Sequence, residues 1–215
     1  MSQKIHEFKS TEEAIHILEK FGKTFEFPTK NLSQEIIINK SVSSNIFRAF
    51  QNLNIPPSKV YRNWATASFD TILSDFKTIK SNKDYYQFIF KYGDSLINRW
   101  AQETKAPNNF LIYGPAMKMI NLLIKDIQES KTYRQIGKIK YQQVPFDSFS
   151  LRPLRLIVNE LTVVKYKISI PPTVSMGFIN TQQLYIILMD AVYKLCKLSK
   201  ISPIVYDYWC WNDKH

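Results

Sequence analysis

The chain has 215 residues, of which 45% are hydrophobic, and this is enough to bury one good core. We therefore interpret residues 1–215 as a single domain rather than two small ones. Lysine and arginine number 29 against 18 acidic residues, a net charge of +11, which favours a polyanionic partner such as DNA, RNA or an anionic membrane surface. The alternative is a generally basic, solvated surface, but the aromatic content of 14% favours nucleic acid.

Several classes of protein are disfavoured by what the sequence lacks. No apolar run approaches the roughly 18 residues that span a bilayer, and the N-terminus has no hydrophobic signal core, so we expect a cytoplasmic protein without a membrane partner. Cys196 and Cys210 form neither a disulfide framework nor a C-x-x-C knuckle, and reduced thiols are expected. His6, His16 and His215 lack ligand spacing, which disfavours a zinc site or a Ser-His-Asp triad. We expect no metal and no cofactor.

Helical periodicity dominates the chain. The first segment, residues 11–21, carries apolar residues at helical spacing behind an N-cap at Ser10 or Thr11. Residues 166–172 alternate weakly, as an extended segment would, but no βαβ rhythm or internal repeat occurs. The pattern predicts an all-α fold, whose further helices are expected at residues 44–53, 57–79, 83–104, 109–129, 149–164 and 181–198.

Tyr113-Gly114-Pro115 predicts a tight turn into a helix. Gly114 is able to adopt a backbone conformation that is closed to other residues, and Pro115 suits the first turn of a helix. Two helices joined by such a turn form a hairpin that offers backbone N–H groups to a DNA phosphate, so Gly114 is predicted to contact DNA. Lys118 and Lys125 lie two helical turns apart and therefore share nearly one face of the helix that follows.

A second motif, Val-Pro-Phe-Asp-Ser at residues 144–148, places a carboxylate in a proline-framed turn. A primary amine from Lys118 and the carboxylate of Asp147, brought together beside DNA, would suit attack on the sugar carbon of a nucleoside. Each residue also has a structural alternative. Lys118 and Lys125 are also compatible with a solvated helix face, the usual place of a lysine pair, and Asp147 with an N-cap for a helix that begins at Phe149 or Ser150.

These residues resemble the helix-hairpin-helix DNA glycosylases, and most closely the archaeal 8-oxoguanine glycosylase branch. The resemblance rests on Tyr-Gly-Pro-Ala-Met-Lys at residues 113–118, a second lysine at Lys125 and the turn at Asp147, within about residues 108–155. In that family a lysine early in the helix after the hairpin attacks the sugar C1′, and an aspartate in a proline-containing turn follows; Lys118 and Asp147 match them. The glycine-rich hairpin of the broader superfamily is not matched, because this chain has a single glycine there.

The resemblance extends to the last residues of the chain. The family has an aspartate and a tryptophan, four residues apart, that hold the extruded base, and Asp207 and Trp211 match that spacing. Leu122, which lies between the two lysines, is expected to contact the base as well. Arg152 and Arg155 are expected to bind phosphates beside the reacting sugar.

The resemblance implies a monomeric helix-hairpin-helix DNA glycosylase-like helical domain, a hydrolase that flips a modified or damaged base out of double-stranded DNA and excises it. Asp147 would stabilise the positive charge that develops on the sugar. Lys118, with a lowered pKa in the presence of Lys125, would attack as a neutral amine and add AP lyase activity, whereas otherwise the reaction would stop at an abasic site. No obligate protein partner is expected.

Three alternatives concern the substrate and the class of protein. Ordinary repair of 8-oxoguanine competes with antiviral defence against phages whose DNA carries modified cytosines; we favour defence, because the first hundred residues and the altered hairpin indicate a different pocket. A non-catalytic, basic helical nucleic-acid-binding protein is the main rival. A nuclease ranks below it, because no acidic pair with a lysine has the spacing of a metal site.

Overall fold

A computed structural model of the chain describes residues 6–42, 55–104, 113–162 and 167–212. Within these ranges the regular elements are helices and no strand occurs, so the predicted all-α class is confirmed. A lone backbone bridge pairs Lys30 with Ser130. Among the described residues, no helix has both the length and the apolar character to cross a membrane. The helix predicted at residues 44–53 lies outside the described residues.

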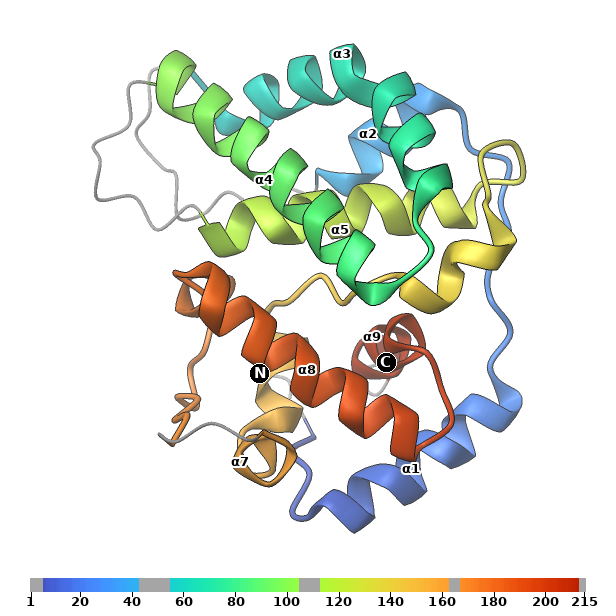
Figure 1. Cartoon of the computed structure of the whole chain (residues 1–215), viewed down its shortest axis with the longest axis vertical. Coiled ribbons are helices and arrows are strands. Elements are labelled where there is room, and N and C mark those ends of the chain that lie inside the picture. Colours follow the sequence, from blue (N-terminus) through green and yellow to red (C-terminus); the bar gives the residue numbers. More distant parts are fainter. Residues whose placement is uncertain (1–5, 43–54, 105–112, 163–166, 213–215) are drawn as a thin grey trace.

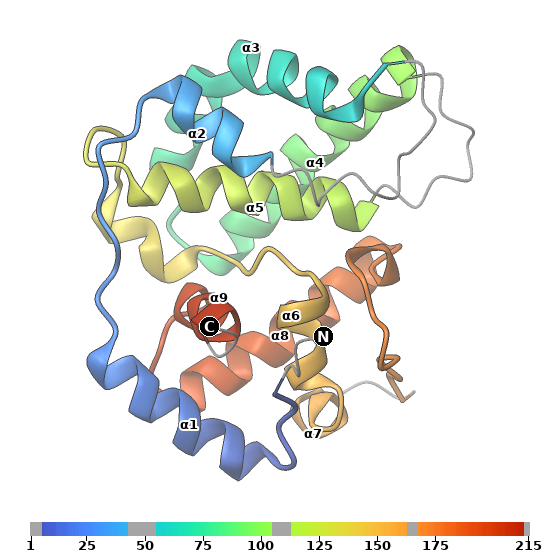
Figure 2. The ribbon, with the colours of Figure 1, turned by 180° about the vertical axis from the view of Figure 1, so that it is seen from behind.

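Two groups of helices lie on either side of an extended segment, residues 142–147 (Figures 1 and 2). The α5 group consists of α2 (Gln34–Ser41), α3 (Pro57–Thr78), α4 (Asn82–Thr104) and α5 (Tyr113–Glu129). The α9 group consists of α1 (Thr11–Thr24), α6 (Ser148–Leu151), α7 (Val158–Leu161), α8 (Gln182–Leu198) and α9 (Pro203–Asn212). A short 3-10 turn, η2 (Ile136–Tyr141), lies between α5 and α6 and so between the two groups. Two others, η3 (Arg152–Leu154) and η4 (Met176–Phe178), lie between successive helices of the α9 group.

Side-chain caps begin several of the helices. Ser10 accepts a hydrogen bond from the backbone N–H of Glu13 at 3.2 Å, and Thr181 accepts one from Leu184 at 3.1 Å. Such caps satisfy N–H groups that have no partner inside the helix. The predicted helices at residues 11–21, 57–79, 83–104 and 181–198 are confirmed, with ends that differ by three residues at most.

The helical pattern fails in three places. The single helix predicted at residues 149–164 is wrong within the described residues: α6, η3 and α7 form instead, because Pro153 has no backbone N–H and interrupts the helix. Two further helices occur where the pattern predicts none. In α2 the buried residues Ile37 and Ile38 are adjacent, and α9 carries aromatic residues on most sides, so neither has the spaced apolar stripe of an amphipathic helix. Residues 167–171 form no regular structure.

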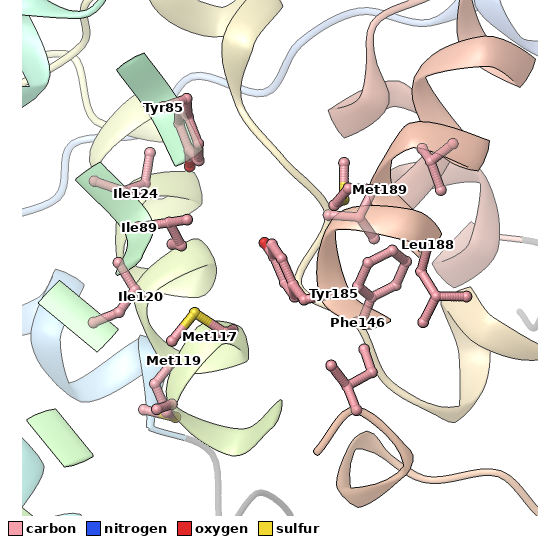
Figure 3. Close-up of a cluster of buried hydrophobic side chains, with 14 of the residues drawn as sticks. Tyr85, Ile89, Met117, Met119, Ile120, Ile124, Phe146, Tyr185, Leu188 and Met189 are labelled. Atoms are coloured by element: carbon pink, nitrogen blue, oxygen red, sulfur yellow. The ribbon is translucent and has the colours of Figure 1, made fainter. Parts of the chain in front are cut away.

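The core passes between the two groups. Apolar side chains of α4 and α5 face Phe146 and the side chains of α8 (Figure 3). A buried chain of hydrogen bonds crosses this core: the Tyr85 hydroxyl donates to Asn121 at 3.0 Å, the Asn121 amide donates to the Tyr185 hydroxyl at 2.8 Å, and that hydroxyl donates to Gln143 at 2.7 Å. Three other parts of the chain, α4, α8 and the segment that contains Gln143, are thereby fixed around α5.

Gly114 is required for close packing rather than for an unusual backbone angle. No glycine among the described residues has a positive φ, so the special conformation predicted for Gly114 is wrong. A Cβ atom at this position would lie 2.0 Å from the carbonyl oxygen of Met176 and 2.9 Å from that of Ile179. Pro115 lies in the first turn of α5, as predicted. The preceding half of the expected hairpin, residues 105–112, lies outside the described residues.

We predict that Gly114→Ala lowers the free energy of unfolding by about 2 kcal/mol or more, because the added methyl group collides with backbone that has little room to move. Gly137→Ala is the matched control, since a Cβ there meets nothing within 4 Å. Urea denaturation of both variants measures the difference, and equal stabilities would contradict this role for Gly114.

Candidate functional site

The first ion pair of the candidate site joins α5 to the start of α6. Lys118 Nζ donates to Asp147 Oδ2 at 2.9 Å, and the two side chains are only 10% and 8% exposed. Lys118 lies in the second turn of α5, while Asp147 ends the extended segment between the helix groups. The structure therefore brings together the amine and the carboxylate that the sequence indicates, and it removes Lys118 from a solvated helix face.

Asp147 is also the N-cap of α6. Its Oδ1 atom accepts hydrogen bonds from the backbone N–H groups of Phe149 at 2.8 Å and Ser150 at 3.2 Å. In return, the Ser150 hydroxyl accepts from the Asp147 N–H at 2.8 Å, which completes a capping box. The structural alternative for Asp147 is thus confirmed. It does not compete with the contact to Lys118, because the cap uses one carboxylate oxygen and the lysine uses the other.

A second ion pair lies two helical turns further along α5. Lys125 Nζ is 2.6 Å from Asp207 Oδ2, and the side chains are 13% and 0% exposed. The same ammonium lies 3.9 Å from the ring centroid of Tyr208, a cation–π contact. Asp207 Oδ1 is buried and has no hydrogen-bond partner among the described residues. This oxygen is therefore an acceptor that no described protein group satisfies.

The two ion pairs influence each other electrostatically. Burial raises the pKa of the Asp207 carboxyl, and Lys125 opposes that rise. From the first ion pair, the charge of Asp147 raises this pKa further and the charge of Lys118 lowers it. Two amines from α5 and two carboxylates, one from the N-cap of α6 and one from α9, therefore form one charged cluster inside the protein.

Apolar side chains border this cluster. Leu122 is one turn from Lys118 on α5 and is partly buried against the core. Trp211 is one turn from Asp207 on α9 and partly exposed, and its ring centroid lies 5.1 Å from that of Phe149. The residues that the sequence indicates for base binding thus come from the two helices that carry the lysines and Asp207.

The remaining residues predicted to bind DNA are engaged elsewhere in the protein. Arg152 Nε donates to the carbonyl oxygen of Pro172 at 2.5 Å, and Arg155 forms an ion pair with Glu7 at 2.8 Å. Gly114 is buried beneath η4. The structure does not gather these three residues with the charged cluster, and their contact with DNA stays a prediction.

An outer group of charges continues the cluster to the end of α5. Glu129 Oε2 accepts hydrogen bonds from Lys30 and Lys40, each at 2.8 Å, and Oε1 accepts one from the Tyr208 hydroxyl at 2.5 Å. Lys40 also contacts Asp126. Burial alone would raise the pKa of Glu129, but these hydrogen bonds outweigh it and lower the pKa to about 2.

Sequence reasoning missed this outer group. The available signal is the presence of two acidic residues, Asp126 and Glu129, in a helix that is otherwise apolar on most sides. Carboxylates buried in such a helix need cationic or hydrogen-bonding partners. The spacing does not identify those partners, because they come from α2, α9 and the segment between α1 and α2.

The grooves on the described surface lie away from the charged cluster. A groove of about 660 Å³ between α3 and α4 and one of about 500 Å³ between α2 and α3 include none of the residues of the ion pairs above. Within the described ranges, no group of three or more histidine, cysteine, aspartate or glutamate side chains is arranged to hold a metal ion.

Comparison with known proteins adds no relative: no protein-family model matches the sequence, and no curated protein or solved structure matches it at a significant level. The resemblance to the glycosylases therefore rests on the residues quoted above.

We predict that Lys118→Met lowers the free energy of unfolding by about 3 kcal/mol, because it leaves the buried Asp147 carboxylate without its cation. Lys91→Met is the control. Lys91 pairs with Asp75 at 2.6 Å but is 61% exposed, so its loss should cost less than about 1 kcal/mol. Urea denaturation compares the two, and equal losses would show that burial does not set the energy of the Lys118 pair.

The lowered pKa of Glu129 makes stability depend on pH. The carboxylate stabilises the fold above its ordinary pKa of 4.5, and this contribution is lost as the pH falls from 4.5 towards about 2. Glu129→Gln should therefore reduce the free energy of unfolding by about 2 kcal/mol near neutral pH, with a smaller reduction below pH 4. Denaturation curves of both proteins across this range measure the difference. A difference that is constant with pH would contradict the assignment.

Proposed function

We propose that the protein is a DNA glycosylase that extrudes a modified or damaged base from double-stranded DNA and cleaves its N-glycosyl bond. The observation that carries the proposal is the buried contact between Lys118 and Asp147, 2.9 Å apart. Asp147 is a carboxylate able to stabilise positive charge on the sugar, and Lys118 is an amine able to attack C1′. The charges of both act on a second carboxylate, Asp207, whose Oδ1 has no described partner. The net charge of +11 supports a polyanionic partner.

Asp147 would stabilise the positive charge that develops on the sugar as the glycosidic bond breaks. Its capping contacts fix the direction of the carboxylate before the substrate arrives. A charge that is already oriented in a water-poor site needs no reorganisation during the reaction, and one such group commonly contributes a few kcal/mol. The low exposure of Asp147 increases its effect on a nearby cation.

Lys118 decides between two outcomes of the reaction. If its proton passes to a neighbouring base, the neutral amine forms a bond to C1′ while the bond from C1′ to the nucleobase breaks, and the resulting Schiff base leads to strand cleavage. If Lys118 stays protonated, water attacks C1′ and an abasic site is the product. In the resting protein the Lys118 Nζ atom is engaged by the Asp147 carboxylate and is not directed at a substrate. Excision without strand cleavage is therefore the main activity that we propose.

The base would lie on the side of the cluster formed by α9. The Oδ1 atom of Asp207, which is buried and has no described partner, would accept a hydrogen bond from an N–H group of the base. Trp211 and Leu122 would contact the faces of the base. Cytosine derivatives, including the modified cytosines of phage DNA, and 8-oxoguanine all present such N–H groups. Defence against phages stays the role that we favour, with repair of 8-oxoguanine as the alternative.

The test is a panel of duplexes that carry 8-oxoguanine, uracil, hydroxymethylcytosine or glucosylated hydroxymethylcytosine, with released base and alkali-labile sites as the readout. We predict release from at least one duplex and a loss of about 100-fold or more in Asp147→Asn. Asparagine is as good an N-cap as aspartate, so this variant should keep the fold of α6. Asp75→Asn, which removes a partly exposed acid from the surface pair with Lys91, should keep full activity.

Absence of release from every duplex, together with tight and salt-sensitive binding, would contradict the enzyme and favour the non-catalytic nucleic-acid-binding protein. In that case Lys118→Gln should weaken binding only slightly and reduce the salt dependence by about one phosphate contact.

A further inference from the structure

Tyr208 is held at both ends by residues one helical turn apart on α5. Its ring lies 3.9 Å from Lys125 Nζ, and its hydroxyl donates to Glu129 Oε1 at 2.5 Å. Lys125 and Glu129 are four residues apart and therefore project from the same face of the helix. The tyrosine is thus clamped between an ammonium at its ring and a carboxylate at its hydroxyl.

The carboxylate end of this clamp is itself fixed. The other oxygen of Glu129 accepts hydrogen bonds from Lys30 and Lys40, and Glu129 is only 2% exposed. A buried carboxylate with both oxygens in charge-assisted or hydroxyl hydrogen bonds has little freedom to rotate. The Tyr208 hydroxyl therefore has a rigid acceptor, and the ring has one preferred position.

That ring position determines how Lys125 meets Asp207. The ammonium lies between the ring and Asp207 Oδ2, while Asp207 Oδ1 has no partner among the described residues. A lysine side chain has enough rotatable bonds to reach either oxygen of a carboxylate, or to turn towards Glu129. The ring contact holds the ammonium beside Oδ2, and Oδ1, which is buried, is left without a described partner.

We propose that Tyr208 and Glu129 are positioning residues for recognition of the extruded base. They confine Lys125 to one oxygen of Asp207, so that Oδ1 stays a fixed acceptor for an N–H group of that base. This inference rests on the proposed function, and it assigns both residues to binding rather than to the breaking of the glycosidic bond.

Tyr208→Phe separates positioning from packing, because it keeps the ring and removes only the hydroxyl that Glu129 holds. We expect KM for the cleaved duplex to rise about tenfold while kcat is unchanged. The same change in the background of Asp207→Asn should add almost nothing, because the single oxygen of asparagine stays with Lys125 and an NH2 donor replaces the acceptor at the position of Oδ1. Glu129→Gln should shift KM in the same direction, and urea denaturation establishes that each variant is folded under the assay conditions.

Tyr86→Phe is the matched control. The Tyr86 hydroxyl also donates to a carboxylate, Asp190, at 2.9 Å, but it lies on α4 and belongs to neither ion pair. Its removal should leave KM and kcat at the values of the unmodified protein.

Binding is measured separately from excision with duplexes in which the modified nucleoside carries a 2′-fluorine, since this substituent disfavours positive charge on the sugar and blocks cleavage. Duplexes with hydroxymethylcytosine, glucosylated hydroxymethylcytosine or 8-oxoguanine are compared with unmodified DNA. We expect Kd for the preferred duplex to rise about tenfold in Tyr208→Phe, but not in Tyr86→Phe.

The outcomes distinguish this inference from the proposed function. Excision by the wild type with an unchanged KM and Kd in Tyr208→Phe would overturn the positioning role and leave the glycosylase intact. An equal loss with and without the Asp207 carboxylate would overturn it as well. Preferential binding of a modified duplex that Tyr208→Phe weakens, without any excision, would support the recognition role and refute the enzyme. No preference of the wild type for any modified duplex would refute base recognition altogether.

Discussion

The burial of two lysines in α5 is the constraint on which the rest of the structure depends. An ammonium group inside a protein costs several kcal/mol unless a carboxylate accompanies it, and α5 has no acid placed to neutralise Lys118. Asp147 and Asp207 supply the partners, and both come from the other helix group. The extended segment, α6 and α9 are therefore held against α5 by charge as well as by the apolar core.

The same contacts serve the proposed chemistry. A carboxylate that stabilises a developing sugar cation must lie in a place with little water, and such a place is also where an unpaired charge destabilises the fold. The resting protein resolves this conflict by pairing Asp147 with Lys118. Substrate binding would redistribute that pairing towards the sugar, so part of the stability of the resting state is exchanged for transition-state stabilisation. At the second ion pair, Tyr208 and Glu129 are the residues that we propose to position Lys125 against Asp207.

The sequence predicts what is local and leaves open what depends on packing. Helices with polar caps and spaced apolar residues are found. The meeting of Lys118 with Asp147 is anticipated from the resemblance to the glycosylases, because a helix start and a proline turn 29 residues apart do not by themselves predict a contact. Gly114 is singled out correctly but for the wrong reason, because the carbonyl groups that approach it come from a distant turn. The sequence of α9 has no spaced apolar stripe, so its pattern does not indicate a helix. The contact between Glu129 and Tyr208 is not predictable from local sequence either, because the two residues are far apart in the chain.

We propose that the sugar C1′ of a target nucleotide lies beside Lys118. Borohydride trapping on a duplex that already contains an abasic site tests this most directly, and it requires no knowledge of the base. Reduction converts a Schiff base between the abasic aldehyde and a nearby amine into a stable bond, and peptide mapping then identifies the lysine. We predict that the adduct maps to Lys118 and disappears in Lys118→Gln. Adducts spread over exposed lysines such as Lys91, with no enrichment at Lys118, would contradict the proposed site.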